Sequence, residues 1–208
     1  MLIPGVAACD TPNRLTEQLR FLPPWRPTRY LRRALAEIRA FWPDAPFVGA
    51  SENEIRRVAS ELTWQLPPKL VEYLTIAVPL HDVMLQTHGD PLRLWGVRGL
   101  GRRQDGYSYN PLLQQDIDDW DRNLLVVADE GADPYVVSLS SPPDTPLQVS
   151  VAPHGAGEWT FEPRCSLATF LVLSTAKHRV LEIGDATGDY EAAEAFWHDV
   201  AQRWENAG

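Results

Sequence analysis

The chain has 208 residues, of which 44% are hydrophobic, and its 28 acidic and 19 basic side chains give a formal net charge of −9. A chain of this length and composition can bury a core without disulfides or a structural metal. Its longest apolar stretches are far shorter than the roughly 20 residues that cross a bilayer, and its N-terminus lacks the features of a secretion signal. The two cysteines, Cys9 and Cys165, are too few for a disulfide framework, so we expect reduced thiols and a cytoplasmic protein without a cofactor.

The charge is unevenly distributed along the chain. Residues 1–50 carry seven arginines and four acidic residues, a net charge of +3, whereas residues 51–208 carry 12 basic and 24 acidic residues, a net charge of −12. A surface of this sign repels nucleic acid and anionic membranes, and it attracts basic proteins over long distances. We therefore expect a protein as the partner, and neither a nucleic acid nor a membrane.

Three amphipathic helices are predicted in the first part of the chain. One covers residues 27–42, and a second begins at Ser51, whose side chain and that of Glu54 match a capping box. A third begins at Pro68, because proline suits the first turn of a helix, and it ends before Pro79. Their inward-facing residues are expected to be Leu31, Ala34, Leu35, Ile38, Phe41 and Trp42, then Ile55, Val58, Ala59 and Leu62, then Leu70, Tyr73, Leu74 and Ala77.

From Leu92 the sequence changes to short apolar runs separated by Gly, Pro, Asn and Asp, which is typical of strands and turns. These runs predict strands near residues 92–97, 124–128, 134–140, 147–152 and 158–162. Two helices follow, one capped by Ser166 and one opened by Asp189, the second with Ala192, Ala193, Phe196, Val200 and Trp204 facing inward. This order of elements predicts an α+β fold, in which helices pack on a central, largely antiparallel sheet. We expect the following to be mostly buried: Ile55, Leu62, Tyr73, Leu74, Val126, Val136, Trp159, Phe170 and Leu171.

Four segments occur in a distinctive order: SENEIRRVASELTWQLPPKLVEYL from Ser51, DDWDRNLLVVADEGADPYVVSLS from Asp118, PLQVSVAPHGAGEW from Pro146 and SLATFLVLS from Ser166. The series resembles the SUKH superfamily, which includes bacterial toxin-immunity proteins and fungal cell-wall-assembly regulators. The Asn-Gly that usually follows the second helix in that family is replaced here by Thr87-His88-Gly89. The resemblance implies a SUKH-like domain over residues 50–179. An N-terminal helical extension over residues 1–49 precedes it, and a C-terminal helix over residues 180–208 packs on the same domain.

For function, the resemblance implies a non-enzymatic immunity protein that binds a cognate polymorphic or contact-dependent toxin and neutralises it by occlusion. Many such toxins are nucleases or nucleic-acid deaminases with basic clefts, which an acidic partner can occupy. One alternative is an intracellular protein-binding regulatory or scaffold module, as the fungal relatives suggest. A second is a small hydrolase that uses Asp129, Glu130, His154 or Glu158.

The segment RRQDGYSYNPLLQQDIDDWDRN, residues 102–123, combines the aromatic side chains that anchor interfaces with dense negative charge. The partner-binding residues that we expect in it are Tyr107, Tyr109, Asp116, Asp118, Asp119, Trp120 and Asp121, with Trp120 or Tyr109 as the anchor. A secondary contact is expected at an exposed acidic turn that contains Asp129 and Glu130. The alternatives are that the aromatic side chains belong to the core and that the acidic turn only connects two strands.

The acidic turn and the residues that follow it are also candidates for a metal site and for a site of nucleophilic catalysis. Asp129 and Glu130 together with His154 and Glu158 have the chemistry to hold a divalent ion, but no known calcium-loop spacing is met. Cys165 begins an apolar helix, where a buried, inert thiol is the usual outcome. We therefore predict no metal site and no catalytic residue.

Overall fold

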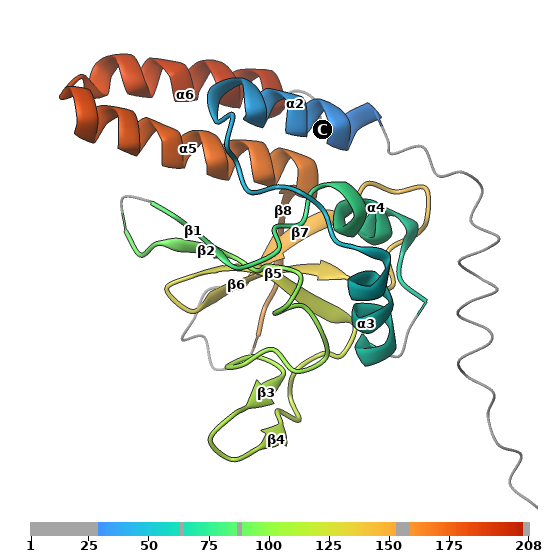
Figure 1. Cartoon of the computed structure of the whole chain (residues 1–208). Helices are drawn as coiled ribbons and strands as arrows, with labels where there is room; N and C mark the ends of the chain where they lie inside the picture. The colour runs from blue at the N-terminus through green and yellow to red at the C-terminus, as the bar shows by residue number, and fades with distance from the viewer. Residues whose placement is uncertain (1–28, 63–64, 87–88, 153–158, 206–208) are drawn as a thin grey trace, which may run out of the picture.

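A computed structural model describes residues 29–62, 65–86, 89–152 and 159–205 of the chain. The predictions that concern Cys9, Thr87-His88, His154 and Glu158 lie outside these residues. Within them the fold is α+β, as predicted, with five helices arranged around a six-stranded antiparallel sheet (Figure 1). None of these helices combines the length and the apolar character needed to cross a membrane.

The central sheet is an antiparallel meander in which neighbouring strands follow one another in chain order. Its strands are β1 (Val83–Leu85), β2 (Leu92–Leu94), β5 (Leu124–Glu130), β6 (Asp133–Ser138), β7 (Gln148–Val151) and β8 (Glu162–Ser166). A separate two-stranded hairpin, β3 (Tyr109–Asn110) and β4 (Gln115–Asp116), is inserted between β2 and β5. The middle of β5 is buried on both of its faces, because helices cover one side of the sheet and the segment that carries the hairpin covers the other.

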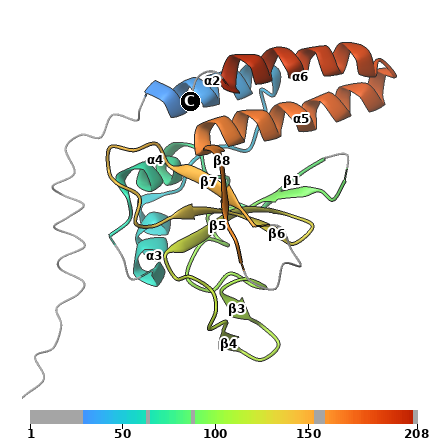
Figure 2. The same cartoon turned by 180° about the vertical axis from the view of Figure 1, so that it is seen from behind.

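The helices form two groups (Figures 1 and 2). In the first group, α2 (Arg29–Phe41) and α6 (Tyr190–Glu205) pack against α5 (Leu167–Thr187), which also contacts β1, β7 and β8. In the second group, α3 (Glu52–Leu62) and α4 (Pro68–Ile76) pack against each other beside the sheet. Helix α5 continues through the domain boundary expected at residue 180 and ends where Gly188 adopts a φ of 73°.

Three of the predicted helix starts, at Ser51, Ser166 and Asp189, are confirmed by side-chain hydrogen bonds. The backbone N–H of Ser51 donates to Glu54 Oε2 at 2.8 Å, and the backbone N–H of Glu54 donates to Ser51 Oγ at 3.4 Å, which completes a capping box. Ser166 Oγ accepts from the backbone N–H of Thr169 at 3.2 Å, and Asp189 Oδ1 accepts from that of Ala192 at 3.0 Å. Each cap satisfies one N–H group that the first turn of a helix leaves without an internal acceptor.

Several details differ from the prediction, mainly at the edges of the sheet. The last strand is Glu162–Ser166 rather than residues 158–162, and β1 was not predicted. Both are edge strands, whose side chains are partly exposed and do not alternate clearly. Trp159 is half-buried and Ala192 is exposed, whereas the other residues predicted for the core between Ile55 and Leu171 are buried.

Candidate functional site

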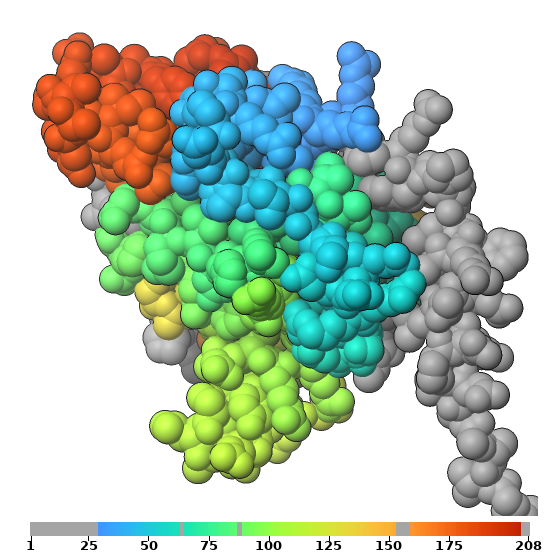
Figure 3. Space-filling view, in the orientation of Figure 1, coloured from blue at the N-terminus to red at the C-terminus, as the bar shows by residue number. Residues whose placement is uncertain are grey.

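The segment from Arg102 to Asn123, here called the arm, leaves the body of the molecule and returns to it. Its β3–β4 hairpin projects from the side of the molecule opposite to α2, α5 and α6 (Figures 1 and 3). Most of the residues that the sequence predicted for partner binding lie in this arm. The arm is therefore the candidate functional surface.

Gln104 fixes the root of the arm to the central sheet. Its side-chain Nε2 donates to the backbone carbonyl of Val126 at 2.8 Å, and its Oε1 accepts from the backbone N–H of Val126 at 2.8 Å. Strand β2 pairs with β5 only at residues 128–130, so Val126 has no hydrogen-bonding partner in β2. The side-chain amide of Gln104 provides the two hydrogen bonds that a neighbouring strand would otherwise form. The backbone carbonyl of Gln104 in turn accepts from the N–H groups of Tyr107, Ser108 and Tyr109. One buried side chain thereby connects β5 to the base of the hairpin.

An aromatic cluster fills the space between the arm and the sheet. Tyr107 and Trp120 are only 6% and 5% exposed, and their ring centroids lie 5.6 Å apart. Trp120 also packs edge-on against Trp159 at 5.6 Å and Phe161 at 5.9 Å. Burial leaves these two side chains little surface for a partner, so the structure does not support Tyr107 and Trp120 as exposed anchors. They belong to the core, which was the alternative that the sequence left open.

The four acidic residues that follow the hairpin turn divide into a paired and an unpaired group. Asp116 accepts from Arg102 at 3.1 Å and lies 3.5 Å from Arg103 Nε, whose guanidinium carbon also lies 5.0 Å from the centre of the Tyr109 ring. Tyr109 and Asp116 therefore contact the two arginines at the base of the hairpin and stabilise its position. In contrast, Asp118, Asp119 and Asp121 are exposed and form no ion pair with any residue that the structure describes. These three carboxylates, here called the collar, lie where the arm returns to the body.

The end of the hairpin exposes two large apolar side chains that the sequence analysis did not single out. Leu112 is 92% exposed and Leu113 is 64% exposed. The side-chain Oδ1 of Asn110 accepts from the backbone N–H groups of both leucines, at 3.0 and 3.1 Å, and so fixes the turn. The signal in the sequence was an Asn-Pro pair followed by two leucines within an otherwise polar segment.

Asp129 is not part of an exposed acidic turn, which corrects the prediction. It is 8% exposed and accepts from Arg93 Nε at 3.0 Å, from Arg93 Nη2 at 2.6 Å and from the indole N–H of Trp95 at 2.6 Å. The register of β2 with β5 places Arg93 directly opposite Asp129. Glu130 is half-buried and accepts from the hydroxyl of Tyr135 at 3.1 Å. Both carboxylates thus stabilise the strand ends.

A hollow of about 330 Å³ adjoins this ion pair. Its lining consists of Arg93, Asp105, Gly106, Tyr107, Asp129, Ala132 and Trp159. Burial, together with the nearby Asp129 carboxylate, raises the pKa of the Tyr107 phenol. Tyr107 therefore stays protonated at neutral pH, and in this hollow the Asp129 carboxylate is already hydrogen-bonded to Arg93.

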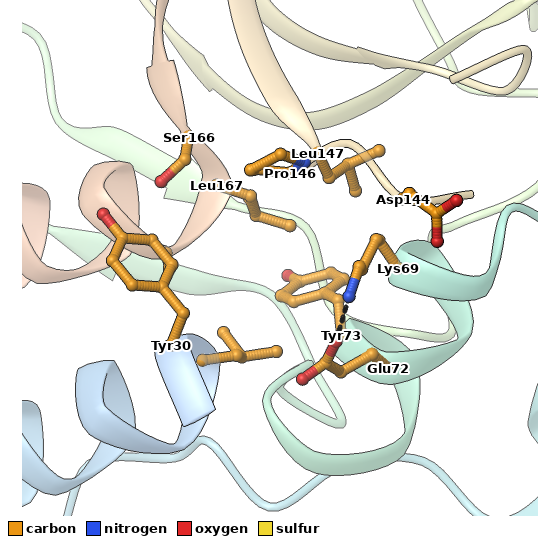
Figure 4. A pocket seen from close by; sticks show the side chains of 11 residues that line it. Tyr30, Lys69, Glu72, Tyr73, Asp144, Pro146, Leu147, Ser166 and Leu167 are labelled. Carbon is orange, nitrogen blue, oxygen red and sulfur yellow. Dashed lines mark ion pairs between the residues drawn. The ribbon is translucent and has the colours of Figure 1, made fainter. Parts of the chain in front are cut away.

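A second hollow, of about 150 Å³, lies between α2, α4, the loop before β7 and the start of α5 (Figure 4). Its walls are mostly apolar, and Lys69 Nζ lies 3.8 Å from the carboxylate of the buried Glu72 at one side. The Tyr30 hydroxyl of α2 is hydrogen-bonded to Thr169 Oγ1 of α5 at 2.8 Å. This hollow lies where the two helix groups meet.

Two further features concern the reactivity of Cys165 and the possibility of a metal site. Burial raises the pKa of Cys165 to about 11, so this thiol is protonated at neutral pH. Among the residues that the structure describes, no three His, Cys, Asp or Glu side chains converge as the ligands of a metal ion do.

In comparisons with known proteins, no family model, no curated protein and no solved structure matches the chain.

Proposed function

We propose that the protein is a non-enzymatic immunity protein that binds a cognate toxin in the cytoplasm and neutralises it by occlusion. The arm is the observation that carries this proposal. It projects from the body, ends in two exposed leucines and carries the exposed collar carboxylates where it returns to the body. An apolar centre beside charged groups is the usual composition of a protein-binding surface. The resemblance of the four sequence segments to the SUKH superfamily suggests that this partner is a toxin.

The charge of the protein favours a basic toxin domain, such as a nuclease or a nucleic-acid deaminase. Residues 51–208 carry a net charge of −12, and the exposed collar carboxylates form no ion pair within the described residues. Complementary charge speeds the encounter of two proteins and favours the correct orientation. A projecting arm that enters or covers a basic cleft would then keep the nucleic-acid substrate out.

A co-expression assay tests the proposal. The gene beside that of this protein is expressed in a host cell alone, with this protein, and with an unrelated acidic protein of similar size. We expect growth to stop when the neighbouring product is expressed alone and to recover only with this protein. If growth stops in all three cases, although both proteins are soluble and abundant, the protein does not confer immunity to that product.

The same arm also suits a second function, that of a regulatory or scaffold module that binds a protein without toxic activity. The assay separates the two functions, because a neighbouring product that binds this protein but leaves growth unchanged favours the scaffold. A hydrolase based on Asp129 has less support, since this carboxylate is already bonded to Arg93 and Trp95.

A further inference from the structure

The two leucines at the end of the arm stand out from the rest of the described surface. Leu112 is 92% exposed, more than any other large apolar side chain in the described residues, and its neighbour Leu113 is 64% exposed. Scattered apolar side chains are common on protein surfaces, but an adjacent pair at the end of a projecting hairpin is a concentrated apolar contact. Figure 3 shows this hairpin standing clear of the body.

The turn that carries these leucines is held in one shape before any partner arrives. Asn110 accepts two backbone hydrogen bonds from the turn, and Gln114 is held at a φ of +54°, in the left-handed region that side chains other than glycine rarely adopt. Below the turn, Tyr109 and Asp116 are paired across β3 and β4. A surface that is ordered in advance loses little conformational entropy on binding, so more of its contact energy appears as affinity.

The charges around the arm specify the chemistry of the surface that would receive it. Arg102 and Arg103 share the single carboxylate of Asp116, so this group keeps one net positive charge. The arm as a whole has three arginines and five aspartates, a net charge of −2, and the collar carboxylates of Asp118 and Asp119 form no ion pair within the described residues. Leu113 at the tip and Asp118 at the start of the collar are five positions apart, a span of about 18 Å at most. A single partner surface can therefore contact both.

We propose that Leu112 and Leu113 anchor the arm in an apolar hollow of the partner, and that arginine or lysine side chains of the partner border this hollow and face the collar. This inference rests on the proposed function, because the partner is the toxin that the protein neutralises. The two parts have different tasks. The leucines slow dissociation by burying apolar surface, and the collar speeds association by attracting the basic border.

Two sets of variants separate these tasks. The tip variant is Leu112→Ser/Leu113→Ser, and its control is Val48→Ser, which alters a side chain that is 67% exposed on the body of the protein. The collar variant is Asp118→Asn/Asp119→Asn/Asp121→Asn, in which an asparagine at 121 keeps the oxygen that accepts from the backbone N–H of Asn123. Its control neutralises three exposed acidic residues elsewhere, Asp44, Glu191 and Glu194.

Binding kinetics are measured against the purified toxin domain encoded by the adjacent gene, at low and at high salt. We expect the tip variant to dissociate about tenfold faster or more, with an association rate within about twofold of the parent. The collar variant should associate about fivefold more slowly at low salt, and the difference should shrink at high salt. Both controls should match the parent, and thermal unfolding should show that all variants are folded.

Three outcomes would overturn the inference. If the tip variant dissociates at the parent's rate and still protects cells, the leucines are not the anchor, although the proposed function stands. If light scattering shows that the parent is a dimer and the tip variant a monomer, the leucines bind a second copy of this chain. If the parent neither binds nor neutralises the toxin domain, the proposed function fails and the inference fails with it.

Discussion

Replacement of Gln104 by leucine should destabilise the protein strongly, although the two side chains are similar in size. Gln104 is 1% exposed and forms two hydrogen bonds with the backbone of Val126, which is itself buried. Leucine offers neither a donor nor an acceptor, so one buried N–H and one buried C=O would lose their partners. Each orphaned group costs about 1–3 kcal/mol, and the apolar contacts of the new side chain offset part of this cost. We expect the free energy of unfolding to fall by about 2–4 kcal/mol.

Urea unfolding followed by tryptophan fluorescence measures this change, since the chain has eight tryptophans. The matched control is Gln115→Leu, the same substitution at an exposed position of β4, where a change within about 0.5 kcal/mol is expected. In a thermal scan, the Gln104 variant should unfold roughly 4–16 °C below the parent. A loss below about 1 kcal/mol would refute the role of Gln104 as a substitute for a strand neighbour.

Two more predictions concern a titrating side chain and a strained turn. Burial lowers the pKa of His178 below 6.5, and its Nδ1 accepts from the backbone N–H of Gln86 at 2.8 Å. As the pH falls below about 6.5, the unfolded chain therefore takes up a proton that the folded chain resists, so the free energy of unfolding should fall. His178→Asn, which keeps an acceptor but does not titrate, should lose less stability between pH 7.5 and 5.5 in urea titrations, and an equal loss would contradict this. Ala132 has a φ of 78° in the two-residue turn between β5 and β6, so Ala132→Gly should raise the free energy of unfolding by about 0.5–1 kcal/mol, and a lower thermal midpoint would contradict this.

The elements that the sequence predicted well are those with a strong local signal. The capping box at Ser51 and the caps at Ser166 and Asp189 mark helix starts that the structure confirms within a residue. The apolar runs that became β5 and β6 were also long enough to be recognised. Each of these signals is contained in a window of a few residues, so no knowledge of distant contacts is needed to interpret it.

The elements that the sequence missed depend on distant parts of the chain or are very short. Strands β3 and β4 have two residues each, which is too short for any alternation of apolar and polar side chains. The burial of Asp129 depends on Arg93, 36 positions earlier, and on a strand register that a local pattern does not contain. Acidic residues next to a glycine usually indicate an exposed turn. Here the same residues lie beside an arginine brought in by a neighbouring strand.

Counting charges in the sequence overestimates the charge that can act on a partner. Asp116 is paired with Arg102 and Asp129 with Arg93, so the field of each carboxylate is largely cancelled at short range. Paired charges of this kind fix the geometry of the sheet and the arm, but they attract little from outside. The exposed carboxylates of Asp118 and Asp119 form no ion pair within the described residues, and they lie in the arm that also carries the exposed leucines. Exposed apolar side chains and unpaired carboxylates therefore coincide on one projecting segment, and this is the reason for proposing the arm as the surface that meets a basic partner.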